Sequence, residues 1–420
     1  MTDKVWLPKG RRTDPPSTKQ QKEEVKEPPT KPKYVPKSKD EVGKDLASKA
    51  DQARVQETIR IKSVGNVEDI LFGTEFTFTD TVLGKLVVPS RSELAKWAKG
   101  AEPAKATKGS KGVKGAKGAK EADDPAAVYA YALAKIERWA GLVKKTTLPE
   151  GAKLVDITTV EGKSPAAKTF KYELTTWKND QPVTDYWYWT LDVDDACLET
   201  QTQPSTAGQL NAPMIRTIIT DHIFKIATEN IGLEVDQSVR GGGGHISIDS
   251  ATTFGGSATL FLAFYKVLQE SAETWAESIH GNKVKEQYDT VNAPWLKDLK
   301  PGSDRSATDG YELFTQTYKT QSAKALRGEI SIEKAAQEIV ALARKLKNPA
   351  ATGQPKDRLV NLEANAQHYQ AVNVEHIADE DPTRRRLELR DVPAQKDLDE
   401  LVRQLTFILE LIEKSRKTVL

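Results

Sequence analysis

The chain has 420 residues, of which 38% are hydrophobic and 29% are charged, and its basic and acidic side chains nearly cancel to a formal net charge of +2. This balance speaks against a protein that binds nucleic acid with its whole surface, and no apolar run approaches the roughly 20 residues of a membrane span. The single cysteine, Cys197, cannot form an internal disulfide, and the N-terminal residues lack the apolar core of a signal peptide. We therefore expect a cytoplasmic protein whose partners are neither membranes nor nucleic acid.

Two lysine-rich segments are predicted to lack a packed core. Residues 1–55 combine many charges with repeated prolines and few large apolar side chains, which indicates a disordered arm. Residues 101–123 place a lysine at every third position from Lys105 to Lys120, with glycines between them, which is typical of a flexible basic loop. The loop is either a tether for an acidic partner or nucleic acid, or a solvated insertion, and we favour the insertion because charge runs are commonly soluble surface.

Residues 56–420 are predicted to form one domain, in which groups of strands are separated by long helices. Strands are indicated where β-branched and aromatic residues mostly alternate with polar ones, at 58–64, 70–79, 168–177, 185–194, 245–250, 370–377 and 384–392. Amphipathic helices are indicated at 213–230, 256–279 and 394–417. In the last helix one buried face is predicted from apolar residues spaced by three and four: Leu398, Leu401, Leu405, Ile408 and Ile412. This arrangement predicts an α+β fold with a largely antiparallel sheet.

The polar faces of four predicted strands carry an unusual set of carboxylates, bases and one histidine. Glu75 lies among phenylalanines in the first, and Asp195 and Glu199 lie four residues apart, on the same side if their strand is regular. His245 follows four glycines and shares a face with two further polar residues. The last strand aligns Arg386, Glu388 and Arg390.

These residue types in combination point to phosphoryl transfer. Carboxylate oxygens are hard ligands suited to Mg²⁺ or Mn²⁺, and one imidazole is compatible with either ion. Arginine beside metal-bound carboxylates supplies positive charge to phosphate oxygens. Transfer of phosphate from ATP needs these groups and little covalent chemistry from the protein.

Four stretches, in chain order, resemble motifs of the glutamine synthetase and glutamate–cysteine ligase superfamily, particularly its amidoligase branch. The stretch GTEFTF is similar to the G-x-E-x-E strand of that family, and DDACLETQTQP to its D-x-x-x-E-x-x-x-P strand. The stretch GGGGHISID resembles the G-H-x-H strand, and the pair NVEHI and RRRLELRDVP resembles the closing strands, an asparagine followed by E-x-R. The resemblance implies a glutamine synthetase-type sheet that binds ATP.

The resemblance also assigns roles to individual residues. It implies that Glu75, His245 and Glu388 ligate one Mg²⁺ or Mn²⁺ ion and that Glu199, with or without Asp195, serves another. Arg390 is expected to contact the transferred phosphate, Arg386 to be a second phosphate contact, and Gly243 and Gly244 to let backbone approach the nucleotide.

The activity implied is an ATP-dependent, ADP-forming ligase that joins a carboxylate to an amine through an acyl phosphate. We expect Asp195 or Asp249 to accept the proton of the amine. Residues 281–350 are expected to form a helical lid or a substrate-specifying insertion. The two substrates, either of which can belong to a peptide or protein, and the oligomeric state stay open.

An inactive member of this superfamily is the alternative. Thr77 and Ser247 stand where many relatives carry a second glutamate and a second histidine. The protein would then be a binding or scaffold protein that acts through its lysine-rich segments. Taken singly, His245 is also typical of a hydrogen-bonded structural residue, and the arginine-rich strand of a surface salt-bridge ladder. His222, in a helix rich in isoleucine, is predicted to be structural.

Overall fold

The computed structural model describes residues 39–90, 92–93, 124–160, 167–235, 243–280, 305–346, 372–390 and 392–419. The chain divides into two units, Met1–Ala47 and Ser48–Leu420, and the sheet with the helices packed on it lies in the second. The predicted basic loop at 101–123 lies outside the described residues. The same holds for residues 1–38 of the predicted arm, and for 281–304 and 347–350 of the predicted lid.

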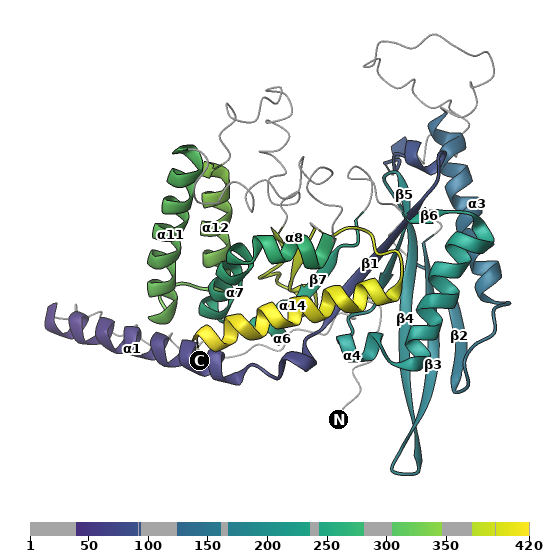
Figure 1. The fold of residues 1–420 in the computed structure, drawn as a ribbon. Helices are drawn as coiled ribbons and strands as arrows, with labels where there is room; N and C mark the ends of the chain where they lie inside the picture. Colours follow the sequence, from purple (N-terminus) through teal and green to yellow (C-terminus); the bar gives the residue numbers. More distant parts are fainter. Residues whose placement is uncertain are drawn as a thin grey trace, which may run out of the picture. The chain divides into compact units, whose positions relative to one another are not determined.

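Nine strands form one sheet in the described part of the chain, in the order β2-β3-β4-β5-β1-β7-β9-β8, with β6 paired to β1 (Figure 1). All neighbouring strands run antiparallel, which confirms the predicted α+β class with an antiparallel sheet. The strands are β1 (Phe72–Thr79), β2 (Ala152–Thr159), β3 (Lys168–Lys178), β4 (Gln181–Asp194), β5 (Cys197–Thr202), β6 (Glu234–Val235), β7 (Ile246–Asp249), β8 (Val372–Asn373) and β9 (Arg386–Leu389).

Long helices separate the groups of strands, as the sequence predicts. The longer ones are α1 (Lys39–Ser63), α3 (Pro125–Val143), η3 (Ile219–Ile231), α7 (Ala258–Glu270), α8 (Ala272–His280), α11 (Arg305–Leu326), α12 (Ile332–Leu346) and α14 (Leu398–Val419). The short ones are η1 (Val67–Asp69), η2 (Leu83–Lys85), α4 (Ala207–Leu210), α5 (Pro213–Ile218), α6 (Ser250–Phe254) and η5 (Pro382–Arg384). Within the described ranges, no helix combines the length and apolar character that crossing a membrane requires.

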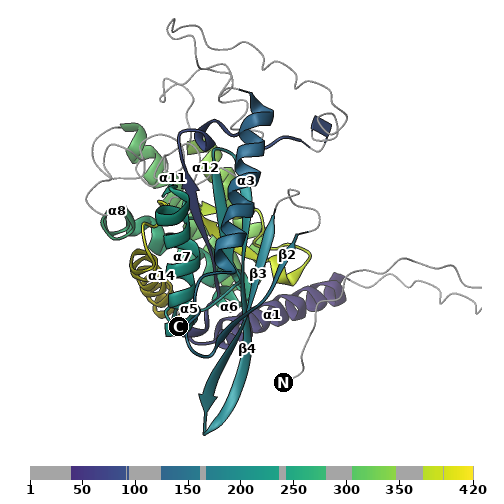
Figure 2. The same cartoon turned by 90° about the vertical axis from the view of Figure 1, so that its right-hand side faces the viewer.

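One face of the sheet is covered by α3 and η3 (Figure 2). The alternation of β1 places Phe76 and Phe78 on this face, where both rings meet Phe224 of η3 edge to face. Trp139 of α3 packs against Phe78 in the same way. His222 is buried, its ring meets that of Tyr172 edge to face, and its Nδ1 is 2.9 Å from the Tyr172 hydroxyl oxygen. His222 is therefore the structural histidine that the sequence predicts.

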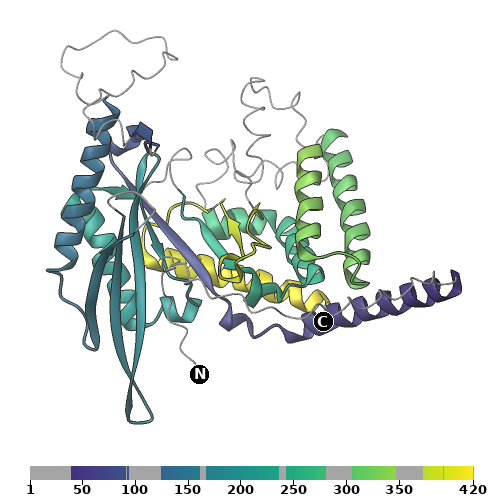
Figure 3. The ribbon, with the colours of Figure 1, turned by 180° about the vertical axis from the view of Figure 1, so that it is seen from behind.

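The C-terminal helices form a second apolar layer, in which α14 packs along α7 and against α8, while α11 and α12 pack together and against α7 (Figure 3). All five residues of the predicted apolar face of α14 are buried. The part of the predicted lid that the structure describes, residues 305–346, is therefore a pair of helices joined to the core through α7.

The sequence prediction is wrong for residues 58–64, which lie at the end of helix α1 and just after it rather than in a strand. Residues 39–55, assigned to the disordered arm, are helical as well. No proline occurs between residues 39 and 63, where Lys, Glu, Ala, Gln and Arg, all good helix formers, are frequent. Burial of Ile61 supplies tertiary packing that local composition does not reveal.

Glu57 fixes the last turns of α1 to the start of α7. Its side chain is 1% exposed, and one carboxylate oxygen accepts hydrogen bonds from Ser257 Oγ at 2.6 Å and from the Thr259 backbone N–H at 3.0 Å. A negative charge at a helix N-terminus is favourable, since it meets the positive end of the helix dipole.

Replacing Glu57 with alanine is expected to lower the free energy of unfolding by about 1–3 kcal/mol, because buried donors then lose their acceptor. Urea unfolding followed by circular dichroism measures the change. The exposed Glu68, replaced in the same way, is the control, with an expected change within about 0.5 kcal/mol. Equal effects of the two substitutions would contradict the anchoring role.

Candidate metal centre

Three neighbouring strands place Glu75, His245 and Glu388 side by side. In the pairing of β1 with β7, Gly73 lies opposite Ser247, and the Glu75 N–H donates to the His245 carbonyl oxygen at 3.1 Å. In the pairing of β7 with β9, Ser247 lies opposite Glu388. Because alternate residues of a strand point to the same face, the three side chains share the face opposite to the helix-covered core.

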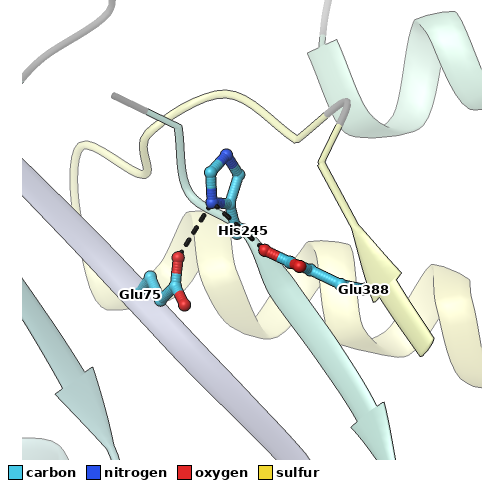
Figure 4. A group of neighbouring side chains, drawn as sticks. All are labelled: Glu75, His245 and Glu388. Carbon is cyan, nitrogen blue, oxygen red and sulfur yellow. Dashed lines mark hydrogen bonds and ion pairs between the residues drawn. The ribbon is translucent and has the colours of Figure 1, made fainter. Parts of the chain in front are cut away.

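The three side chains converge on the Nδ1 atom of His245 (Figure 4). This nitrogen lies 2.9 Å from Glu75 Oε2 and 3.5 Å from Glu388 Oε1, and the three donor atoms all lie within 4.8 Å of one another. The side chains of His245, Glu75 and Glu388 are 15%, 18% and 8% exposed, so that the cluster is largely shielded from water.

The metal-free cluster holds protons that a cation would replace. Burial, together with the nearby charge of Glu388, raises the pKa of Glu75 to about 8. Burial, together with the charge of Arg390, lowers the pKa of His245 to about 4. At pH 7 the imidazole is therefore neutral, as a metal ligand must be, whereas Glu75 keeps its proton until a positive charge favours the carboxylate.

Both oxygens of Glu388 have polar partners. Arg390 Nη1 donates to Oε1 at 2.7 Å, and Asn373 Nδ2 of β8 donates to Oε2 at 3.0 Å. These two bonds fix the direction of a buried carboxylate and offset the cost of its burial. The resemblance marked the position of Asn373 but assigned no role to it; the structure places it beside the cluster as the residue that orients Glu388.

The donor set fits a divalent cation. Ligands at right angles on an ion with bond lengths of about 2.1 Å lie about 3 Å apart, and the observed separations of 2.9 and 3.5 Å are close to this spacing. Two carboxylate oxygens with one imidazole nitrogen suit Mg²⁺ or Mn²⁺. Three of the four predicted metal ligands are thus brought together.

Glu199, the fourth predicted ligand, lies on the same sheet face beside the cluster, but it does not belong to the three residues whose ligand atoms lie within 4.8 Å of one another. It lies on β5 opposite Thr77, and its carboxylate accepts a hydrogen bond from the side-chain amide of Gln201, two residues away on the same face. Burial, with the charges of Glu75 and Asp194, raises the pKa of Glu199 well above its usual range. That Glu199 is a ligand of a second metal ion therefore stays a prediction.

Asp195 does not share a strand face with Glu199. The chain turns at Asp195 and Ala196, between β4 and β5, and the exposed carboxylate of Asp195 accepts the Val88 backbone N–H at 2.8 Å. The premise of one regular strand is therefore wrong, and with it the geometric basis for Asp195 as metal ligand or proton acceptor. Asp249 is also engaged elsewhere, since its Oδ2 accepts the Thr252 N–H at 2.6 Å and caps α6.

The remaining predicted residues lie on or beside the same strands. Arg386 is half-buried on β9, two positions from Glu388 on the same face. Gly243 and Gly244 are buried, and the close approach they permit is to other protein groups. A Cβ at Gly243 would lie 2.8 Å from His245 Nε2, and one at Gly244 would lie 2.4 Å from the Pro393 carbonyl oxygen. Their contact with nucleotide, and the phosphate contacts of Arg386 and Arg390, stay predictions.

Fold and site together define an α+β protein whose antiparallel sheet carries a half-buried carboxylate–histidine cluster suited to a divalent cation. Comparison with known proteins adds no closer identification: the chain matches no protein-family model, no curated protein and no solved structure.

Proposed function

We propose that the protein is an ATP-dependent carboxylate–amine ligase with a glutamine synthetase-type sheet, which forms an amide or peptide bond and releases ADP. The observation that carries the proposal is the meeting of Glu75, His245 and Glu388 on one sheet face, with Arg390 bonded to Glu388. These are the residues to which the family resemblance assigns a metal ion and the transferred phosphate. The metal, ATP and the cytoplasmic location are part of the proposal.

In the proposed reaction a substrate carboxylate attacks the γ-phosphorus of ATP, the bond from that phosphorus to the bridging oxygen breaks, and ADP leaves. The amine then attacks the acyl carbon, and phosphate departs as the amide forms. A divalent cation held by the cluster would withdraw charge from the phosphate oxygens. Arg386 of β9 and Arg390, which directly follows the strand and bonds to Glu388, would supply guanidinium groups that neutralise charge as the phosphoryl group moves.

The amine must lose a proton, and Glu199 replaces Asp195 and Asp249 as the candidate acceptor. Both aspartates are engaged by backbone N–H groups away from the cluster. Glu199 is half-buried, and its pKa is raised by burial and by the charges of Glu75 and Asp194. A raised pKa makes a carboxylate a stronger base near neutral pH.

A second candidate function, binding without catalysis, is favoured by Thr77. This residue lies on β1 between Glu75 and the end of the strand, is 2% exposed, and its hydroxyl oxygen has no hydrogen-bond partner among the described residues. A threonine in place of a carboxylate leaves less negative charge for a second cation. An inactive protein that still binds metal and nucleotide would follow.

The test is Mg²⁺- or Mn²⁺-dependent release of ADP from ATP in the presence of pooled amino acids and amines. Wild type is compared with Glu388→Gln and His245→Ala. Because loss of charge stabilisation in a transition state costs about 10²- to 10³-fold in rate, both variants are expected to lose ADP release. Glu173→Gln, on the same sheet but away from the cluster, is the matched control and should retain it.

Nucleotide binding is measured on the same samples. Metal-dependent ATP binding without ADP release from any pool would favour the binding protein. No metal-dependent ATP binding at all would contradict the ligase, as would ADP release that persists in both cluster variants.

A further inference from the structure

Two buried glutamines form a hydrogen-bonded relay that ends at the peptide unit before His245. Gln395, in the segment between β9 and α14, donates through Nε2 to the Gly244 carbonyl oxygen at 3.0 Å and to Gln404 Oε1 at 2.9 Å. Gln404 of α14 donates through its own Nε2 to the Ile279 carbonyl oxygen in α8 at 3.2 Å. The relay thus joins α8, α14 and the strand that carries the histidine.

The position of Gln404 argues against simple packing. It is fully buried on the apolar face of α14, beside Leu401, Leu405 and Ile408, where the spacing calls for another apolar residue. Gln395 is 1% exposed; its Nε2 makes both bonds of the relay, whereas its Oε1 has no hydrogen-bond partner among the described residues. A buried amide is costly unless its hydrogen-bonding groups are satisfied, so a paired amide in such a face indicates a requirement for these particular bonds.

The relay acts on backbone that is already confined on other sides. The Gly244 N–H donates to the Val392 carbonyl oxygen at 3.0 Å, and the His245 carbonyl oxygen accepts the Glu75 N–H at 3.1 Å. A Cβ at Gly244 would lie 2.2 Å from Gln395 Nε2, so that only glycine lets the amide approach. The peptide units on both sides of the Gly244–His245 peptide are therefore held by neighbouring segments, and the relay holds the carbonyl oxygen of the Gly244–His245 peptide itself.

We propose that Gln395 and Gln404 are positioning residues of the cluster, which hold the Gly244 carbonyl so that His245 Nδ1 faces Glu75 and Glu388. The expected effect on metal binding rests on the metal centre of the proposed function. The geometry of the relay does not depend on that function. The outer end of the relay is the Ile279 carbonyl oxygen, so that the relay connects the last turn of α8 with the peptide unit before the histidine.

The test uses Gln395→Met and Gln404→Met, which preserve side-chain length and remove the amide. Two properties are measured: the imidazole NMR signals of His245 in the metal-free protein, assigned with His245→Ala among the five histidines of the chain, and the Mn²⁺ affinity by calorimetry. Both variants are expected to shift the His245 signals and to weaken Mn²⁺ binding by about 10- to 100-fold, the usual effect of outer-shell changes. Gln404→Met should have the smaller effect, since it retains the direct bond to Gly244.

Gln321→Met is the matched control, because Gln321 is a buried glutamine of α11 that makes no contact with the cluster among the described residues. It should leave the His245 signals and the Mn²⁺ affinity unchanged, and the signals of His222 should stay constant in all variants. Loss of thermal stability in the relay variants with unchanged His245 signals would overturn the proposal, since the glutamines would then be structural only.

The outcome separates this proposal from the proposed function. If wild type binds no Mn²⁺, the metal centre fails, yet a shift of the His245 signals in Gln395→Met would still support the positioning role. If wild type binds Mn²⁺ and the relay variants bind it equally well, the positioning role fails and the metal centre stands. If Gln395→Met does not fold, the His245 signals and the Mn²⁺ affinity of Gln404→Met test the positioning role instead.

Discussion

Replacing His245 with alanine is expected to weaken Mn²⁺ binding by more than about 100-fold. This loss exceeds the one expected when a residue that only supports a ligand is replaced. The imidazole Nδ1 is the atom on which both carboxylates converge, at 2.9 Å for Glu75 and 3.5 Å for Glu388. Its removal takes away the nitrogen ligand and leaves two carboxyl groups as the remaining ligands of the cluster. Calorimetric titration with Mn²⁺ at pH 7.5 measures the loss.

His376→Ala is the control for that experiment. His376 is half-buried between β8 and β9, and its Nδ1 lies 3.3 Å from Asp379 outside the cluster. The control is expected to bind Mn²⁺ like the wild type. Unchanged affinity in His245→Ala would show that the cation binds elsewhere and would remove the basis of the proposed function.

The second large effect is a steep pH dependence of metal affinity. Since the pKa of Glu75 is raised to about 8, its proton must leave when the cation binds. The affinity should therefore rise about tenfold per pH unit between about pH 6 and 8 and level off above. His245, with a pKa of about 4, is already neutral there and adds nothing to the slope.

Calorimetry in buffers of different ionisation enthalpy measures the proton release directly, and close to one proton per ion is expected at pH 6.5. Glu75→Gln should bind more weakly but with a much flatter pH dependence. A flat profile in the wild type would mean that Glu75 is ionised before the ion arrives, and the burial argument would be wrong.

The same carboxyl group affects the metal-free fold. An unperturbed glutamate, as in the unfolded chain, has a pKa of 4.5, whereas the pKa of Glu75 in the folded protein is about 8. The folded state therefore holds the proton more tightly than the unfolded state does. Its contribution to stability is fully present below pH 4.5 and is lost as the pH rises through 8. Glu75→Gln removes this loss, which urea unfolding at pH 5.5 and pH 8 can detect.

The sequence predicts the centre of the site because three features agree. Glu75, His245 and Glu388 each lie on or directly before a strand whose apolar residues alternate, so each belongs to a polar face. The order of their motifs along the chain resembles that of a known superfamily, and this resemblance implies that the strands belong to one sheet. Antiparallel register then brings them together, with Gly73 opposite Ser247 and Ser247 opposite Glu388.

The failures have equally local causes. The turn at Asp195 and Ala196 contains neither glycine nor proline, and Ala196 takes a left-handed φ of 65° that its type rarely adopts. The alternating pattern therefore continues through the turn and resembles one strand. At residues 58–64 the β-branched side chains favour a strand locally, but burial of Ile61 and the bonds of Glu57 favour a helix.

The glutamine relay has no signal in the sequence. Gln404 interrupts an apolar helical face, and Gln395 lies in a connecting segment. Neither feature predicts which group the side chain bonds to. Their common target, Gly244, is distant in the chain. Only the tertiary structure joins them, because contacts between segments far apart depend on how the helices pack over the sheet.

The wide separation of β1, β7 and β9 along the chain also has a consequence during translation. The ribosome releases the segments that carry Glu75 and His245 well before the one that carries Glu388 and Arg390. Before β9 has left the ribosome, the nascent chain lacks one donor residue and the strand that pairs with both β7 and β8. If the proposed metal centre forms, it is therefore completed only at a late stage of biosynthesis, after β9 has left the ribosome.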